Sequence, residues 1–354
     1  MRIHSYNPWR LVDQRSFVDF GNANGHEQVI CDIDKTYIET EFESLVGLAK
    51  TAFEGAHAKV TVAGASELLL ALRWGNMDSA GVEGPANVYP RPLHFVTSSP
   101  REMRKVLETK LLLDGLDWNT DTFKNQAYNI RKGRFDLLKQ QIAYKSAAML
   151  LLAAEQPSPV SFTLIGDNAE LDPYLYLGFK LFLERRISAA RYKMYLLNAG
   201  VEASVVEDIF AKKLQLPAGT VKNIFIRKLP NYPTPQGAPF TDPIVFFDDY
   251  FDVALALMHR EYFDPACLFS LTRKLHNWHK VPLDILYGKM KSYLPHMKAS
   301  QRNALLENLN KIQGVIGERA EQAPLTTPWL TRDENWEKLA EDEFVELGQV
   351  WLRR

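Results

Sequence analysis

The stretch EQVICDIDKT, residues 27–36, opens with a short apolar run and then places two aspartates one residue apart, Asp32 and Asp34. The apolar run is β-rich and uninterrupted, which is typical of a strand buried on both faces of a sheet. Two carboxylates at the exit of such a strand repel each other and resist losing their water. The stretch therefore predicts a bound cation or a chemical reaction at this strand end.

Two further segments, 91–100 and 160–172, repeat the pattern of a short apolar strand followed by small, hydroxyl or acidic residues, and a fourth strand is predicted at 221–229. Segments with helical spacing lie between the strands, at 64–74, after Pro100 and at 135–157. This alternation predicts an α/β fold with a parallel sheet and flanking helices. In such sheets the ligand site lies beyond the carboxyl ends of the strands.

A proline-rich stretch divides the chain. Five prolines fall within residues 230–243, which predicts a linker because proline cannot extend a regular helix or a central strand. We expect an N-terminal arm, a catalytic domain, this linker and a helical C-terminal region. Their predicted bounds are 1–26, 27–229, 230–243 and 244–354.

The bulk composition is that of a globular protein: 354 residues, 46% hydrophobic and 24% charged, with a formal net charge of -1. This near-neutral balance gives no global attraction to nucleic acid, so no nucleic-acid partner is indicated. The two cysteines cannot form a disulfide framework, and Cys31 is interpreted as a small buried residue. The sequence contains neither a signal-peptide pattern nor an apolar run long enough to span a bilayer, which predicts a cytoplasmic protein.

The polar residues at the predicted strand ends form a set suited to phosphate chemistry. The acids of the set are Asp32, Asp34, Asp167 and Asp172. Their oxygens favour Mg²⁺ over zinc, because no cysteine or histidine is interleaved. Lys145, in the helix before the third strand, would supply the positive charge that an anionic substrate needs. Thr97, at the end of the second strand, offers a hydroxyl to a phosphate oxygen beside the N–H groups of a helix start.

In this order the residues resemble the four motifs of the haloacid dehalogenase superfamily of phosphatases. The motifs are D-x-D-x-T, an apolar strand ending in Thr or Ser, a lysine, and G-D-x-x-x-x-D. The matching residues are Asp32, Asp34 and Thr36, then Thr97, then Lys145, and finally Gly166, Asp167 and Asp172. The resemblance implies a Rossmann-like parallel sheet. The alternative interpretation of the paired acids is a strand-terminal acidic turn that caps a helix.

The resemblance also implies roles for these residues. Asp32 would attack the phosphorus and form an aspartyl-phosphate, and Asp34 would protonate the leaving oxygen and then activate a water molecule. Mg²⁺, held by Asp32, the backbone carbonyl of Asp34 and Asp167, would neutralise the phosphoryl oxygens. Asp172 would complete the outer shell of the metal or orient Lys145. The residues predicted to grip the phosphoryl group or bind the substrate are Thr97 and Lys145, together with Thr36, Ser98, Ser99 and Arg131.

A narrower resemblance, within residues 27–229, is to the phosphatidate phosphatase catalytic domain related to the lipins. It rests on the segments FVTSSP, YKSAAMLLLAAEQPSPVSFTLIGDNAELDPYLY and IFIRKL, whereas Lys35, Asn168 and Ala169 depart from the pattern of that family. The resemblance implies phosphatidate or a related lipid phosphate as the substrate. The alternatives are a protein, nucleic-acid-end or small-molecule phosphatase of the same superfamily, and a catalytically silent lipid- or protein-binding module.

Two further features bear on the substrate. The spacing between Thr36 and Thr97 leaves room for a short flap and one helix, which predicts no large cap and a site open to a bulky substrate. Residues 272–298 carry six Lys/Arg against Asp284 alone, with Trp278 and two tyrosines interleaved. Such a mixture is typical of a segment that makes transient contact with an anionic membrane, at which the protein would be peripheral. A solvated helical face is the alternative.

Overall fold

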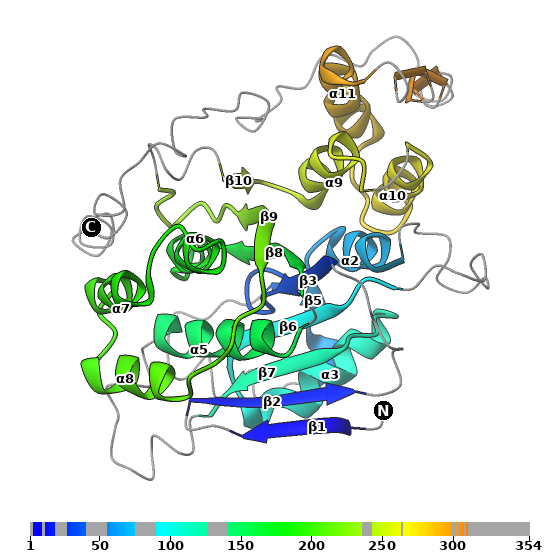
Figure 1. The fold of residues 1–354 in the computed structure, drawn as a ribbon. Helices are drawn as coiled ribbons and strands as arrows, with labels where there is room; N and C mark the ends of the chain where they lie inside the picture. The colour runs from blue at the N-terminus through cyan, green and yellow to red at the C-terminus, as the bar shows by residue number, and fades with distance from the viewer. Residues whose placement is uncertain are drawn as a thin grey trace.

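The computed structural model describes residues 3–8, 11–17, 27–39, 55–74, 90–125, 141–156, 158–235, 243–262, 265–298 and parts of 302–310. Eight strands of these residues form one sheet in the order β1-β2-β7-β6-β3-β8-β9-β10 (Figure 1). Their bounds are β1 (Ile3–Pro8), β2 (Val12–Phe17), β3 (Glu27–Cys31), β6 (Leu93–Pro100), β7 (Thr120–Lys124), β8 (Val160–Asp167), β9 (Gly219–Arg227) and β10 (Ile244–Phe247). A separate antiparallel pair joins β4 (Ile38–Glu39) to β5 (Val60–Thr61).

The sheet is mostly parallel. The six strands from β7 through β6, β3, β8 and β9 to β10 all run in the same direction. At one edge β2 pairs antiparallel with both β7 and β1. The four strands predicted from the sequence are all present, as β3, β6, β8 and β9. The α/β prediction is therefore confirmed, and the fold is compatible with a Rossmann-like arrangement.

Both edges of the sheet differ from the prediction. Residues 12–17, expected in an N-terminal arm, form β2 and pair with β7. A buried guanidinium reinforces this junction, because Arg104 forms ion pairs with Asp13 of β2 and with Asp121 of β7. At the opposite edge, β10 follows the proline-rich stretch and pairs with β9, so the region expected to be helical from residue 244 begins with a strand.

Helices cover both faces of the sheet. One face carries α2 (Ala65–Trp74), α3 (Arg104–Leu113), α9 (Tyr250–His259), α10 (Pro265–Asn277) and α11 (Leu283–Tyr293), and the other carries α5 (Gln141–Ala154) and α6 (Asp172–Leu183). The helices α7 (Ala189–Asn198) and α8 (Ala203–Ala211) pack against α6 and α5. Three short 3₁₀ turns, Ala56–Ala58, Arg101–Met103 and Leu294–His296, and helical residues within 302–310 are also described. The protein is thus a three-layer α/β structure over these residues.

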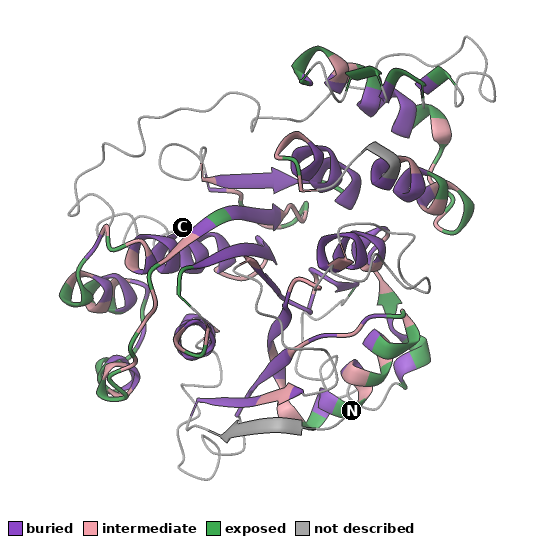
Figure 2. Cartoon of the chain, turned by 45° about the vertical axis from the view of Figure 1, so that its right-hand side comes forward, coloured by how far each residue is buried: buried purple, intermediate pink, exposed green. Residues whose placement is uncertain are grey.

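The core explains why β3 is continuously apolar. Val29 and Cys31 belong to the hydrophobic cluster on the α2 and α9 face, whereas Ile30 belongs to the cluster on the α5 and α6 face. Successive side chains of a strand point to opposite faces, so a strand covered on both sides needs an apolar residue at every position. Figure 2 shows buried residues concentrated in the central strands and in the helices beside them. Both cysteines, Cys31 and Cys267, are buried thiols.

The segment between Thr36 and Thr97 is described in part. It contains the β4–β5 pair and α2, which agrees with the predicted flap and single helix. Residues 40–54 and 75–89 lie outside the described residues, so the absence of a large cap stays a prediction. Among the helices that are described, none has the length and hydrophobicity needed to cross a membrane.

Candidate active site

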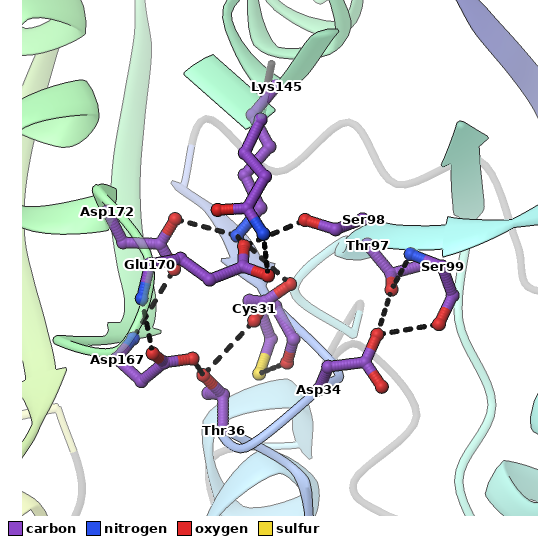
Figure 3. A network of polar contacts seen from close by, with 12 residues as sticks. Cys31, Asp34, Thr36, Thr97, Ser98, Ser99, Lys145, Asp167, Glu170 and Asp172 are labelled. Atoms are coloured by element: carbon purple, nitrogen blue, oxygen red, sulfur yellow. Dashed lines mark hydrogen bonds and ion pairs between the residues drawn. The ribbon is translucent and has the colours of Figure 1, made fainter. Parts of the chain in front are cut away.

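The predicted site residues lie at the carboxyl ends of three neighbouring strands. β3 lies between β6 and β8, and the helix α2 that follows β3 and the helix α5 that precedes β8 lie on opposite faces of the sheet. Such a switch point is where α/β sheets bind their ligands. Asp32 and Asp34 follow β3, Thr97 lies near the end of β6, and Asp167 is the last residue of β8. Figure 3 shows Lys145 descending from α5 above Asp34 and Asp167, with Glu170 and Asp172 beside its ammonium group.

Lys145 is the positive centre of the site. Its Nζ lies 2.6 Å from Glu170 Oε2, 2.7 Å from Asp172 Oδ1 and 3.3 Å from Asp32 Oδ1. Burial disfavours the ammonium form, but the three carboxylates together outweigh it and hold the pKa of Lys145 well above its usual value. The structure therefore places a fixed positive charge beside Asp32. Asp172 contacts Lys145, a position that would allow it to orient the lysine, one of the two roles predicted for it.

Asp32 and Asp167 share the hydroxyl group of Thr36. Thr36 Oγ1 lies 3.3 Å from Asp32 Oδ2 and 3.1 Å from Asp167 Oδ2. A hydroxyl group donates one hydrogen bond at a time, so on this side the two carboxylates share a single donor. Burial raises the pKa of Asp32 well above its ordinary value despite Lys145, and burial with Asp172 and Glu170 raises the pKa of Asp167 to about 7. Thr36, expected to bind substrate, instead bridges the two acids and is fully buried.

Asp34 faces β6. Its Oδ2 accepts hydrogen bonds from Thr97 Oγ1 at 2.9 Å and from Ser99 Oγ at 2.6 Å, and the Ser99 N–H donates to Thr97 Oγ1 at 3.0 Å. Asp34 Oδ1 is buried without a hydrogen-bond partner among the described residues. Burial raises the pKa of Asp34, which favours a protonated carboxyl group. In Figure 3 this carboxyl lies on the side of the site away from Asp167, so its side chain is separate from the Asp32–Asp167 pair.

Glu170 is a site residue that the sequence interpretation left out. Its carboxylate accepts from Ser98 Oγ at 2.7 Å and from Gln141 Nε2 at 2.8 Å, besides its ion pair with Lys145. Ser98, expected to bind substrate, therefore holds Glu170. The sequence contains the signal, since Glu170 is a third acid between Asp167 and Asp172, inside the segment on which the family resemblance rests.

The spacing of the G-D-x-x-x-x-D motif has a steric reason. Asp172 starts α6, and its Oδ2 accepts from the Asp167 N–H at 3.3 Å, directly across Gly166. A Cβ at Gly166 would collide with the Asp172 carboxylate and would lie 2.9 Å from the ring of Tyr176. Only glycine leaves room for Asp172 to reach back over the end of β8.

The loop after β3 is held by residues far away in the sequence. Lys35 adopts a left-handed conformation with φ of 58°, and its carbonyl accepts from Arg227 Nη1 at 2.6 Å. The Thr36 carbonyl accepts from the hydroxyl of Tyr250 at 2.9 Å. Arg227 and Tyr250 thus support the backbone on which Asp32 and Asp34 lie, and nothing local in the sequence reveals this.

Two of the departures from the family pattern meet at the start of the proline-rich stretch. Asn168 Nδ2 donates to the Tyr232 carbonyl at 3.1 Å, and Asn168 Oδ1 accepts from the Leu229 N–H at 2.7 Å. Lys35 Nζ donates to the hydroxyl of Tyr232 at 2.8 Å. Residues 229–234 are therefore tied to the rim of the site.

Two sets of acids could hold a metal ion. Asp32, Glu170 and Asp172 offer carboxylate oxygens within 4.8 Å of one another. The ammonium of Lys145, however, already lies at ion-pair distance from all three. The predicted pair, Asp32 and Asp167, fits Mg²⁺ better, because two buried carboxylates with raised pKa values face each other there with one hydroxyl between them.

Arg131 lies outside the described residues, so its predicted role stays a prediction.

At the opposite, amino-terminal end of the strands, a cavity of about 560 Å³ contains none of the predicted residues. The cations Arg91 and Lys222 on its wall both form ion pairs with Glu27. The acid and lysine chemistry of the molecule is concentrated at the carboxyl edge instead.

A mostly parallel α/β sheet with buried carboxylates and a buried lysine at its switch point defines an enzyme-like centre. Residues 27–191 match the family model described as "Phosphatidate phosphatase APP1, catalytic domain". Over these residues the match confirms the predicted resemblance to a phosphatidate phosphatase catalytic domain, and it indicates a phosphatase and supports a lipid phosphate as the substrate. Comparisons with curated proteins and with solved structures gave no match.

Proposed function

We propose that the protein is a magnesium-dependent phosphatidate phosphatase of the haloacid dehalogenase type, acting through an aspartyl-phosphate. The observation that carries this proposal is the environment of Asp32. One of its oxygens lies 3.3 Å from the Lys145 ammonium, and the other is beside the hydroxyl that it shares with Asp167. A carboxylate flanked by a fixed positive charge and a metal-binding partner is suited to attack an anionic phosphate ester.

In the first step an Asp32 oxygen forms a bond to phosphorus as the bond from phosphorus to the glycerol oxygen breaks. Asp34, whose pKa burial raises, donates its proton to that leaving oxygen. In the second step Asp34 takes a proton from a water molecule, the water oxygen bonds to phosphorus, and Asp32 is released. Lys145 holds its positive charge beside the transferred group throughout. Asp32 and Asp167 would hold Mg²⁺, which would supply positive charge to phosphoryl oxygens.

The polar contacts of Asp34 support its separate role. Thr97 and Ser99 both donate to the same oxygen, so they fix the carboxyl group and leave the other oxygen as the position for a transferable proton. The two aspartates that repel each other in the sequence thus have different tasks, because one faces Lys145 and the other faces β6.

The test is phosphate release from phosphatidate in mixed micelles, compared with release from soluble phosphopeptides and nucleotides, with and without Mg²⁺. We expect Mg²⁺-dependent turnover with a preference for the lipid, abolished in Asp32→Asn. Equal turnover of soluble substrates would refute the lipid assignment, and activity in the presence of a chelator would refute the metal. Acid quenching, borohydride reduction and peptide mapping should locate the trapped phosphoryl adduct at Asp32.

A further inference from the structure

The turn between α10 and α11 exposes large apolar side chains. Trp278 is 65% exposed and Ile285 is 44% exposed, although the described part of the chain buries most side chains of this size, Trp118 completely. Tryptophan combines a large apolar ring with an N–H donor, which suits it to the boundary between lipid headgroups and acyl chains. The exposure of these apolar side chains of the turn to water is therefore unfavourable.

Positive charge surrounds these side chains. Lys274 Nζ lies 5.5 Å from the centre of the Trp278 ring, and both Arg273 and Lys280 are exposed. The acid in this part of the chain is Asp284. Exposed aromatic and aliphatic groups beside several cations are complementary to an anionic bilayer, whereas a soluble acidic partner would use the charges and leave Trp278 in water.

The turn lies at the same edge of the sheet as the active site. Tyr250, which donates to the Thr36 carbonyl, packs against Gly64, where an added Cβ would lie 3.2 Å from Tyr250 Cβ and 3.1 Å from Leu275 Cδ2. Leu275 is in the last turn of α10, one helical turn before Trp278. His279 Nε2 lies 3.0 Å from Glu67 Oε1 in the first turn of α2, so the end of α10 is anchored at this edge (Figure 1).

We propose that residues 273–285, at the end of α10 and the start of α11, form a membrane-contact surface for anionic bilayers. Trp278 and Ile285 enter the headgroup boundary, Lys274 and Lys280 contact anionic headgroups, and the carboxyl edge of the sheet then faces the lipid. The proposal rests on the lipid phosphatase function proposed above. It explains how a protein whose net charge is -1 reaches a substrate embedded in a bilayer.

Binding is tested first, with a lipid that the enzyme does not hydrolyse. The full chain is floated with vesicles of phosphatidylcholine, with and without phosphatidylserine, at low and high salt. Trp278→Ala should weaken binding about tenfold. Lys274→Gln and Lys280→Gln should each weaken it about fivefold and reduce its salt dependence. Matched controls on the α7–α8 side are Leu197→Ala, at a side chain 42% exposed, and Lys212→Gln, and both should bind like the unmodified protein.

Turnover is the second measurement. For each variant, turnover of phosphatidate in vesicles is divided by turnover of a water-soluble short-chain phosphatidate, and the ratio should fall with vesicle binding. A folded Trp278→Ala protein that floats like the unmodified protein would overturn the proposal. If that variant melts earlier, Ile285→Asp gives the same test by placing a charge on the same surface. Absence of turnover on both lipids would refute the proposed function, whereas the flotation result would still test the membrane-contact surface.

Discussion

Lys145→Met removes the cation that lies against three carboxylates, the buried Asp32 and Asp172 and the mostly buried Glu170. The Lys145 ammonium lies within 3.3 Å of Asp32, Glu170 and Asp172, and its side chain is 2% exposed. Removing one partner from a buried ion-pair set costs about 3–5 kcal/mol, because the remaining charges stay buried without compensation. In a protein of 354 residues that loss corresponds to a fall of roughly 4–7 °C in Tm.

The same substitution should create a metal site. Without the ammonium, the three acids offer oxygens within 4.8 Å of one another and no cation between them. Mg²⁺ or Ca²⁺ at about a hundred times its Kd would then restore about 2.7 kcal/mol. Phosphatase activity should stay absent, because an ion at that position replaces the lysine but leaves the phosphoryl group without a donor.

Thermal unfolding in chelator, Mg²⁺ and Ca²⁺ measures both effects. The matched control is Lys180→Met, since Lys180 is also buried and forms an ion pair with Glu184 at 2.6 Å, away from the acids of the site. We expect divalent ions to raise the Tm of Lys145→Met by several degrees more than that of Lys180→Met or of the unmodified protein. Equal metal responses in all three proteins would refute the assignment of Lys145 as the cation of this cluster.

Three further predictions concern the site and its support. Ser99→Ala removes one of the two donors to Asp34 and should lower kcat up to about tenfold with little change in KM, since a hydrogen bond contributes about 0.5–1.5 kcal/mol. Ser99→Thr should recover part of the loss, and an unchanged kcat would contradict the role of Asp34. Burial lowers the pKa of His94 to about 3, so its neutral form stabilises the fold above the unfolded pKa and that stability is lost as the pH falls. Urea unfolding should show the unmodified protein losing about 2 kcal/mol more than His94→Gln between pH 7 and pH 5, and equal losses would count against this. Asn168→Ala leaves the Leu229 N–H without its acceptor and should increase hydrogen exchange in residues 229–234, whereas unchanged protection would show that the tie is unimportant.

The central strands were predictable because strands that are buried between two layers of helices are rich in apolar residues. β3 and β8 are covered by helices on both faces, and so apolar residues of each strand pack on both sides of the sheet, which gives the apolar segments that the sequence shows. The strand β7 was missed for the opposite reason. Its sequence, TDTFK, is polar, yet all five residues are buried, because Asp121 pairs with Arg104 and the strand lies between β6 and β2.

The edges of the sheet followed the same logic. β1, β2 and β10 are short and lie at or near the two edges, where pairing with a distant strand decides whether a segment becomes part of the sheet. Such pairing depends on contacts between residues far apart in the chain, and no local pattern encodes it.

The sequence alone determined that Asp32, Thr97, Lys145 and Asp167 belong to one site, because parallel strands bring their carboxyl ends to one edge. Only the tertiary structure shows which neighbouring groups each acid contacts. Asp34 turns to Thr97 and Ser99, Glu170 and Asp172 surround Lys145, and Arg227 holds the loop from β9. The physical reason is that the strand order fixes where each strand ends. The direction of each carboxyl group depends instead on hydrogen bonds and ion pairs with groups a few ångströms away.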